Sequence, residues 1–134
     1  MASGYTFECT HCKYSFMAWD DGNPYFRSDK GRPQFFYHPD EGRLFEYVSQ
    51  SVGRDLTGEA LNEFLKKRTG NMTDMLCLDC GRRFKRDLRR QKPVCPSRKC
   101  KSANISDLCE LEDKICPKCK QGVFKCDPDN VAIS

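Results

Sequence analysis

Three features of the sequence predict a small α+β protein in which bound metal supplements a modest hydrophobic core. Four closely spaced cysteine pairs suit two four-thiolate sites, one nested inside the other. Hydrophobic residues make up only 38% of the 134 residues, which is low for a large core. A 64-residue interval between the first two cysteine pairs is rich in aromatic residues. We expect this interval to form an inserted hairpin-plus-helix segment.

The clearest metal signal is the stretch from Cys77 to Cys100, where two cysteine pairs are separated by 14 residues. A C-x2-C turn brings two sulfur atoms to one ion, and the second pair completes a tetrahedral shell of four thiolates. Because the protein fills all four positions, such a zinc site holds structure and leaves no open position for a substrate. The alternative, disulfide pairing, requires an oxidising compartment.

The start of the chain and its hydropathy favour a reducing compartment. A secreted disulfide scaffold would follow a signal peptide, but residues 1–10 lack a basic start, an apolar run and a small-residue cleavage site. No stretch approaches the roughly 18 apolar residues of a membrane span. We therefore expect a cytoplasmic protein without a membrane partner, whose cysteine pairs bind metal.

The order of the cysteine pairs suggests how they share two zinc ions. We expect a strand that enters a C-x2-C turn and continues to a phenylalanine at two places, 5–16 and 75–84. The last two cysteine pairs begin differently, with the sequences V-C-P and I-C-P. Nesting joins each opening turn to a closing turn and closes the shortest loop first, at the least entropic cost. Nesting predicts site 1 at Cys77, Cys80, Cys95 and Cys100, and site 2 at Cys9, Cys12, Cys116 and Cys119.

Other cysteine groupings remain open. An interleaved pairing joins the first pair to the third, and a sequential pairing joins the first pair to the second. Cys109 and Cys126 read as small buried residues in the strand-like runs L-C-E-L and V-F-K-C. They would be ligands in a rival quartet of symmetric spacing, formed by Cys109, Cys116, Cys119 and Cys126. His11, inside the first turn, is redundant as a ligand, and we expect it to be exposed.

The inserted interval predicts a hairpin, a short element and one helix. Two strands, at 25–28 and 34–38, flank the turn D-K-G-R, and a further strand or helix start is expected at 44–48. The helix is expected at 56–68, with Thr57 as its N-cap.

The predicted helix carries an apolar stripe of Leu61, Phe64 and Leu65, and we expect Gly70 to end it. We expect the stripe to pack in a core. The aromatic residues of the interval also suit a core better than a stacking platform for single-stranded bases, because phenylalanine outnumbers tyrosine and the interval is not basic.

The inner cysteine module resembles zinc ribbons, particularly the small FmdB-type regulatory ribbons. The likeness rests on C-L-D-C-G-R-R-F from Cys77, on V-C-P around Cys95, and on C-K-S from Cys100. Four residues separate Cys95 from Cys100, where these ribbons usually have two. As a class, zinc ribbons imply contacts with nucleic acid or protein in transcription and related machinery.

A second, split ribbon is suggested at 5–16 plus 115–126, so that the resemblance covers about 45 of the 134 residues, and no family is recognised for 17–74. The expected organisation has three parts. These are an outer split ribbon of 5–16 with 109–128, an inserted α+β segment at 17–74, and an inner basic ribbon at 75–108.

Positive charge is concentrated on the inner module. Residues 82–101 contain ten Lys or Arg and one Asp, a net charge of +9, whereas the rest of the chain has a net charge of −5. An anionic partner would relieve this self-repulsion, and phosphate groups are the natural candidates. The residues predicted to contact nucleic acid are Arg82, Arg83, Lys85, Arg86, Arg89, Arg90, Lys92, Arg98, Lys99 and Lys101.

The sequence therefore predicts a regulatory or accessory protein that binds DNA or RNA through its zinc ribbon. The alternative is a protein-interaction adaptor, or a subunit of a larger assembly with structural zinc sites. We do not expect an enzyme or a small-molecule substrate, because the cysteine pairs fill both metal shells and no H-E-x-x-H or G-x-S-x-G motif occurs. The one candidate acid–base site is His38 beside Asp40 and Glu41.

Overall fold

The computed structural model describes residues 2–27, 31–37, 43–44, 46–47 and 58–133. The chain divides into two compact units. One consists of Met1–Gly22 with Thr73–Ser134, and the other is Asn23–Met72. Among the described residues, no helix combines the length and the apolar character that a membrane crossing requires.

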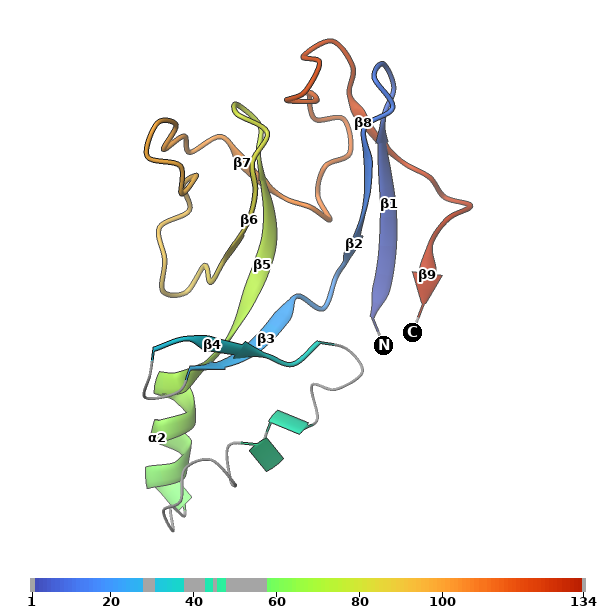
Figure 1. Ribbon diagram of the computed structural model, residues 1–134. Coiled ribbons are helices and arrows are strands. Elements are labelled where there is room, and N and C mark those ends of the chain that lie inside the picture. Colours follow the sequence, from blue (N-terminus) through green and yellow to red (C-terminus); the bar gives the residue numbers. More distant parts are fainter. Residues whose placement is uncertain (1, 28–30, 38–42, 45, 48–57, 134) are drawn as a thin grey trace. The chain divides into compact units, whose positions relative to one another are not determined.

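The unit Asn23–Met72 is built on a short antiparallel sheet (Figure 1). β3, Asn23–Arg27, pairs with β4, Pro33–Phe35. β3 also pairs with the first residues of β5, Thr69–Cys77. The β3–β4 pair is the hairpin predicted around D-K-G-R.

α2, Gly58–Arg68, is the predicted helix, and two residues of its apolar stripe pack on aromatic residues of the hairpin segment. Phe64 and Leu65 lie against the buried rings of Phe26 and Phe36. These contacts place aromatic residues of the interval in a core, as the sequence suggests.

The helix ends at Arg68 as predicted, but Gly70 does not cap it, because the chain passes directly from α2 into β5 at Thr69. The Thr69 hydroxyl donates to the Leu65 carbonyl, so one of the last helix carbonyls has a partner without a glycine cap. Gly70 instead pairs with Tyr25 in the sheet. In the segment predicted as a strand or helix start, Tyr47 is helical, and the predicted N-cap Thr57 lies outside the described residues.

The other unit contains two antiparallel sheets, the first formed by both ends of the chain (Figure 1). Its central strand is β1, Ser3–Cys9, between β2, Ser15–Trp19, and β8, Phe124–Cys126. β9, Ala132–Ile133, pairs with the start of β1. The prediction that V-F-K-C forms a strand is confirmed by β8.

The second sheet of this unit holds the inner cysteine module. The later residues of β5 lie between β6, Arg83–Arg86, and β7, Ile105–Asp107. β1 ends at Cys9 and β5 ends at Cys77, so each of the first two cysteine pairs begins on the last residue of a strand. Strand ends fix the direction in which each cysteine pair leaves its sheet.

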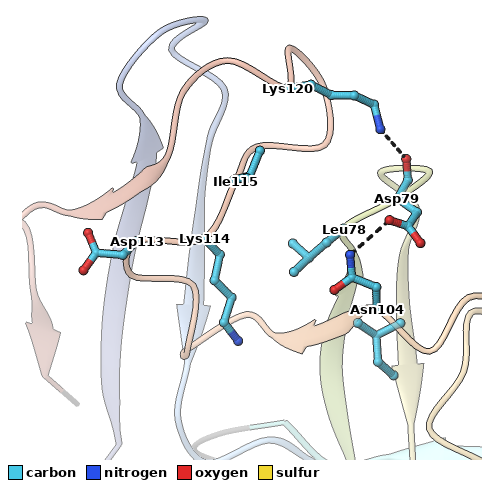
Figure 2. A pocket seen from close by; sticks show the side chains of 8 residues that line it. Leu78, Asp79, Asn104, Asp113, Lys114, Ile115 and Lys120 are labelled. Carbon is cyan, nitrogen blue, oxygen red and sulfur yellow. Dashed lines mark hydrogen bonds between the residues drawn. The ribbon is translucent and has the colours of Figure 1, made fainter.

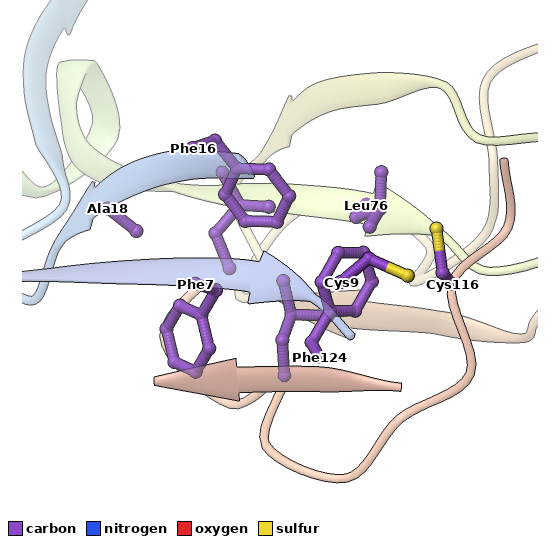
Figure 3. Packing of buried hydrophobic residues seen from close by; sticks show 9 residues of the cluster. Phe7, Cys9, Phe16, Ala18, Leu76, Cys116 and Phe124 are labelled. Carbon is purple, nitrogen blue, oxygen red and sulfur yellow. The ribbon is translucent and has the colours of Figure 1, made fainter. Parts of the chain in front are cut away.

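Both sheets contribute to one hydrophobic core (Figure 3). Alternate residues of β1 face inward, so Phe7 and Cys9 pack with Phe124 of β8, whose ring is fully buried. Leu76 of β5 joins the same cluster, and so does Cys116. Two of the predicted metal ligands are therefore part of the core, and their positions depend on its packing.

The strand predicted around Cys109 is wrong. β7 ends at Asp107, and the carboxylate and carbonyl of Asp107 accept hydrogen bonds from the N–H groups of Cys109 and Glu110, at 2.8 Å and 3.0 Å. An Asp that bonds the backbone two residues later forms a turn in place of a strand ladder. Cys109 consequently lies in a turn and packs against the core from there.

The core position of Phe124 predicts a large mutational effect. Phe124→Ala should lower the free energy of unfolding by about 3–5 kcal/mol, because it removes a fully buried ring that packs on Tyr14 and Phe16. Ile133→Ala is the control, since the Ile133 side chain is 69% exposed and its loss should cost within about 0.5 kcal/mol. Urea unfolding of the metal-loaded variants measures both values. Equal midpoints for the two variants would contradict this account of the core.

Candidate metal centres and basic segment

The structure gathers eight of the ten cysteines into two groups of four. Within each group the sulfur atoms all lie within 4.8 Å of one another. Each group could hold one metal ion, and together they contain the cysteines that the nested pairing places together. The groups are Cys77, Cys80, Cys95 and Cys100, and Cys9, Cys12, Cys116 and Cys119.

The sulfur–sulfur distances fit a tetrahedral metal shell. Cys77 and Cys100 Sγ are 3.7 Å apart, as are Cys80 and Cys95 Sγ. In the other group, Cys9 to Cys119 is 3.6 Å and Cys12 to Cys116 is 3.7 Å. A zinc–sulfur bond of about 2.3 Å gives a tetrahedron with an edge of about 3.8 Å. A disulfide would require about 2.05 Å, so these distances suit a shared ion.

The same tight backbone turn follows all four cysteine pairs. The residue after the second cysteine has a left-handed conformation in every case, with φ between 49° and 81°. These residues are Lys13, Gly81, Lys101 and Lys120. Each donates its N–H to the carbonyl four residues earlier, as Gly81 does to Cys77 at 2.9 Å. Only Gly81 has the residue type that signals this conformation.

The wider spacing of Cys95 and Cys100 is absorbed by the loop between them. The Cys9 N–H donates to the carbonyl five residues later, but the Cys95 N–H donates to Ser102, seven residues later, at 2.8 Å. The tight turn then starts at Ser97, whose carbonyl accepts from Lys101 at 3.0 Å. The extra two residues therefore lengthen the loop and leave both sulfurs directed at the same point.

Backbone N–H groups stabilise negative charge on the cysteine sulfurs. The Gln121 and Gly122 N–H groups lower the pKa of the Cys119 thiol to about 6. Burial raises the pKa of Cys116 to about 11, and the neighbouring thiols of Cys12 and Cys9 add to this effect. The two sulfurs therefore differ in how readily they lose a proton, and a divalent cation would stabilise the deprotonated form of all four.

Gly122 is required beside the outer group, although no motif in the sequence marks it. A Cβ at this position would lie 2.6 Å from Cys9 Sγ and 2.7 Å from the His11 backbone nitrogen. The Gly122 N–H also donates to Cys119 Sγ at 3.5 Å. Any side chain at this position would displace a predicted ligand.

Asp79 is a second residue that motif analysis does not single out. It lies between Cys77 and Cys80, and its carboxylate accepts hydrogen bonds from the Ser102 hydroxyl and from Asn104 Nδ2. These bonds, that from Ser102 first, hold the pKa of Asp79 below its usual value. Asp79 thus connects the Cys77–Cys80 turn to the residues that follow Cys100.

The remaining cysteines lie outside both groups. Cys109 and Cys126 are partly buried and pack against the core, and burial raises the pKa of the Cys109 thiol to about 12. Among the described residues, the rival quartet is therefore not brought together. His11 is exposed, and His38, the candidate acid–base residue, lies outside the described residues.

The ten basic residues of 82–101 divide into two sets. In the first set, the Arg83 guanidinium lies 5.3 Å from the Phe16 ring centroid and Lys85 pairs with Asp74 at 2.7 Å. Arg86 lies over the Phe84 ring and donates to the Val94 carbonyl, and Arg90 also interacts within the chain. In the part of the chain that the structure describes, the other six are exposed and their side chains bond no other residue. They are Arg82, Arg89, Lys92, Arg98, Lys99 and Lys101.

No family model, curated protein or solved structure matches this chain. The resemblance to zinc ribbons therefore rests on the cysteine spacing. The two four-cysteine groups are compatible with sites of the zinc-ribbon kind. What the chain does has to be argued from its own residues.

Gly122→Ala should loosen the outer group, because the added methyl collides with Cys9 Sγ. We expect metal bound there to pass to a colorimetric chelator at least about tenfold faster, a difference of about 1.4 kcal/mol. Gln121→Ala is the matched control, since Gln121 is exposed and only its backbone N–H reaches Cys119. Identical release from both variants would show that Gly122 does not shape this group.

Replacing a grouped cysteine should cost far more than replacing an ungrouped one. Cys77→Ser removes one of four sulfurs from the inner group, whereas Cys109→Ser changes a thiol that only packs against the core. Losing a metal ligand is expected to unfold much of a small metal-held unit. Thermal melting followed by circular dichroism checks this. Equal tolerance at the two positions would contradict the assignment of ligands.

Proposed function

We propose that each four-cysteine group binds one Zn²⁺ ion, and that the two sites form nested zinc ribbons that present a nucleic-acid-binding surface. The ligand set supports zinc, because four thiolates in tetrahedral arrangement select Zn²⁺ or iron–sulfur centres. With four protein ligands each, the sites are structural: zinc supplies rigidity to the turns and leaves no position for a reactant.

The observation that carries the proposal is the set of six exposed cations on the inner module. Five of them lie within three residues of a cysteine of the inner group, and Arg89 lies six residues before Cys95, so bound zinc would help to fix the loops that carry them. Their charge is not offset by a bonded carboxylate in the described residues, unlike that of Lys85. Phosphate groups of DNA or RNA would offset it and release counterions.

The loop after β6 is organised to project part of this surface. Asp87 is buried, and its carboxylate accepts from the Arg89 N–H at 3.1 Å while its own N–H donates to the Gln91 side chain at 2.9 Å. This turn leaves Leu88 51% exposed next to Arg89. We propose that Arg89 contacts a phosphate and that Leu88 contacts a sugar or base face, as apolar side chains do in grooves.

In this proposal the protein is an accessory or regulatory factor, and the engaged basic residues Arg83, Lys85 and Arg86 support the surface without contacting the ligand. A protein-binding adaptor is the second candidate. It is favoured by a groove beside Ile115, whose side chain is 61% exposed.

Fluorescence anisotropy with labelled DNA and RNA oligonucleotides at rising salt tests the proposal. Arg89→Gln with Lys99→Gln should weaken binding and reduce the slope of log K against log salt by about two, one for each lost phosphate contact. Lys66→Gln with Lys67→Gln is the matched control, because it removes the same charge from α2. The proposal fails if wild-type binding is absent at low salt, if it does not respond to salt, or if the control loses as much affinity.

A further inference from the structure

A groove lies between the outer and inner cysteine modules within one compact unit (Figure 2). Its volume is about 630 Å³, within the range of roughly 300–1,000 Å³ typical of ligand sites. One wall comes from 113–115 and Lys120, and the other from 78–79 and 104–105. The groove uses none of the six exposed cations of the inner module.

The first wall contains an isolated β-bridge whose outward side has no backbone partner among the described residues. Ile115 forms an isolated antiparallel bridge with Val123, flanked by hydrogen bonds from Phe124 N to Lys114 O and from Cys116 N to Gly122 O, each 2.9 Å. In this antiparallel pattern alternate residues point their backbone groups away from the partner strand. The N–H and C=O of Ile115 therefore point away from Val123, and neither makes a hydrogen bond to another described residue.

The opposite wall contributes two apolar side chains beside Asp79 and Asn104. Leu78 follows β5 and Ile105 begins β7, and both side chains line the groove opposite Ile115. Figure 2 shows the Leu78 side chain directed into the space toward Ile115 and Lys114. An exposed strand edge beside apolar side chains is a site where an extended peptide adds as a further strand.

The side chains of Lys114 and Lys120 reach across the groove at its two ends (Figure 2). Lys114 Nζ donates to the Ser106 hydroxyl at 2.9 Å, and Lys120 Nζ donates to the Asp79 carbonyl at 3.1 Å. Both acceptors are neutral, so neither hydrogen bond neutralises an ammonium charge.

The carboxylates that line the groove, in contrast, already have donors. Asp79 accepts from Ser102 and Asn104, and Asp113 pairs with Lys125. The Asp79 carboxylate, however, receives these bonds from neutral groups and attracts Lys120, so its charge offsets that ammonium. Lys114 makes no ion pair with another described residue, so the charge left to a ligand is positive at the Lys114 end of the groove.

We propose that this groove binds a short extended segment of a partner protein, with apolar residues at its centre and an acidic residue at the end beside Lys114. The backbone of the segment pairs with the N–H and C=O of Ile115, and its apolar side chains cover Leu78 and Ile105. Its carboxylate bonds Lys114. This protein-binding site is separate from the proposed nucleic-acid surface, and one protein could hold both ligands.

The probe is a fluorescein-labelled synthetic peptide with two glutamates at each end and a centre of valine and isoleucine. Anisotropy with the zinc-loaded full chain gives its affinity. A second peptide of equal charge, with glycine and serine at the centre, controls for attraction to the basic segment. The protein variants are Ile115→Glu and, as matched control, Ile133→Glu, because both isoleucines are exposed on short strands or bridges, 61% and 69%.

We expect the apolar-centred peptide to bind at least about tenfold more tightly than the glycine–serine peptide. Ile115→Glu should remove this difference, and Ile133→Glu should retain it. Hydrogen exchange of the Ile115 amide should slow when the peptide is bound. Three results would each overturn the proposal: no binding up to about 1 mM, equal affinity of both peptides, or unchanged binding by Ile115→Glu. Oligonucleotide binding by the same variants is measured in parallel, so failure of the groove is distinguishable from failure of the nucleic-acid surface.

Discussion

The close approach of four sulfur atoms at each of two points is the constraint on which the described structure depends. The sulfurs are 3.6–3.7 Å apart in the recorded pairs, too far for disulfides and too close for thiolates without a cation. In the outer group, Cys9 and Cys119 are 110 positions apart. Closing so long a loop costs conformational entropy that grows with the logarithm of its length. A bound ion would offset this cost and link Cys9 to Cys119.

The hydrophobic core and the sulfur groups support each other. Cys9 and Cys116 belong to the core cluster, where Phe124 and Leu76 surround them from two different sheets. A core of this size stabilises a small domain only modestly, and metal ligation is the usual supplement. The proposed zinc ions would therefore hold in place both the cationic loops and the two walls of the groove, which are separate surfaces with different ligands.

The parts of the structure that the sequence predicts are those that depend on spacing and periodicity. The cysteine pairs, the hairpin around D-K-G-R and the helix at Gly58–Arg68 all follow from local patterns. The helix ends at Arg68 as predicted, but the Thr69 hydroxyl supplies the cap that Gly70 was expected to provide. The strand expected at Cys109 does not form, because the Asp107 side chain accepts a hydrogen bond from the Cys109 N–H in a turn, in place of a bond to a neighbouring strand.

Features that depend on tertiary contact are beyond sequence reasoning. The left-handed lysines after three of the four cysteine pairs do not have the residue type that marks such a conformation. The need for glycine at position 122 appears only when Cys9, far away in the sequence, lies against it. Likewise, ten basic residues look equivalent in the sequence, and only their neighbours separate Arg83, over the Phe16 ring, from a free cation such as Lys99.

Native mass spectrometry of the reduced full chain tests the central claim most directly, since it counts bound ions and reports the oxidation state of the thiols in one measurement. The account predicts a mass increase of two zinc ions, with all ten cysteines unpaired by disulfides. A folded chain without metal, a count of one or three ions, or sulfurs oxidised to one another would contradict it.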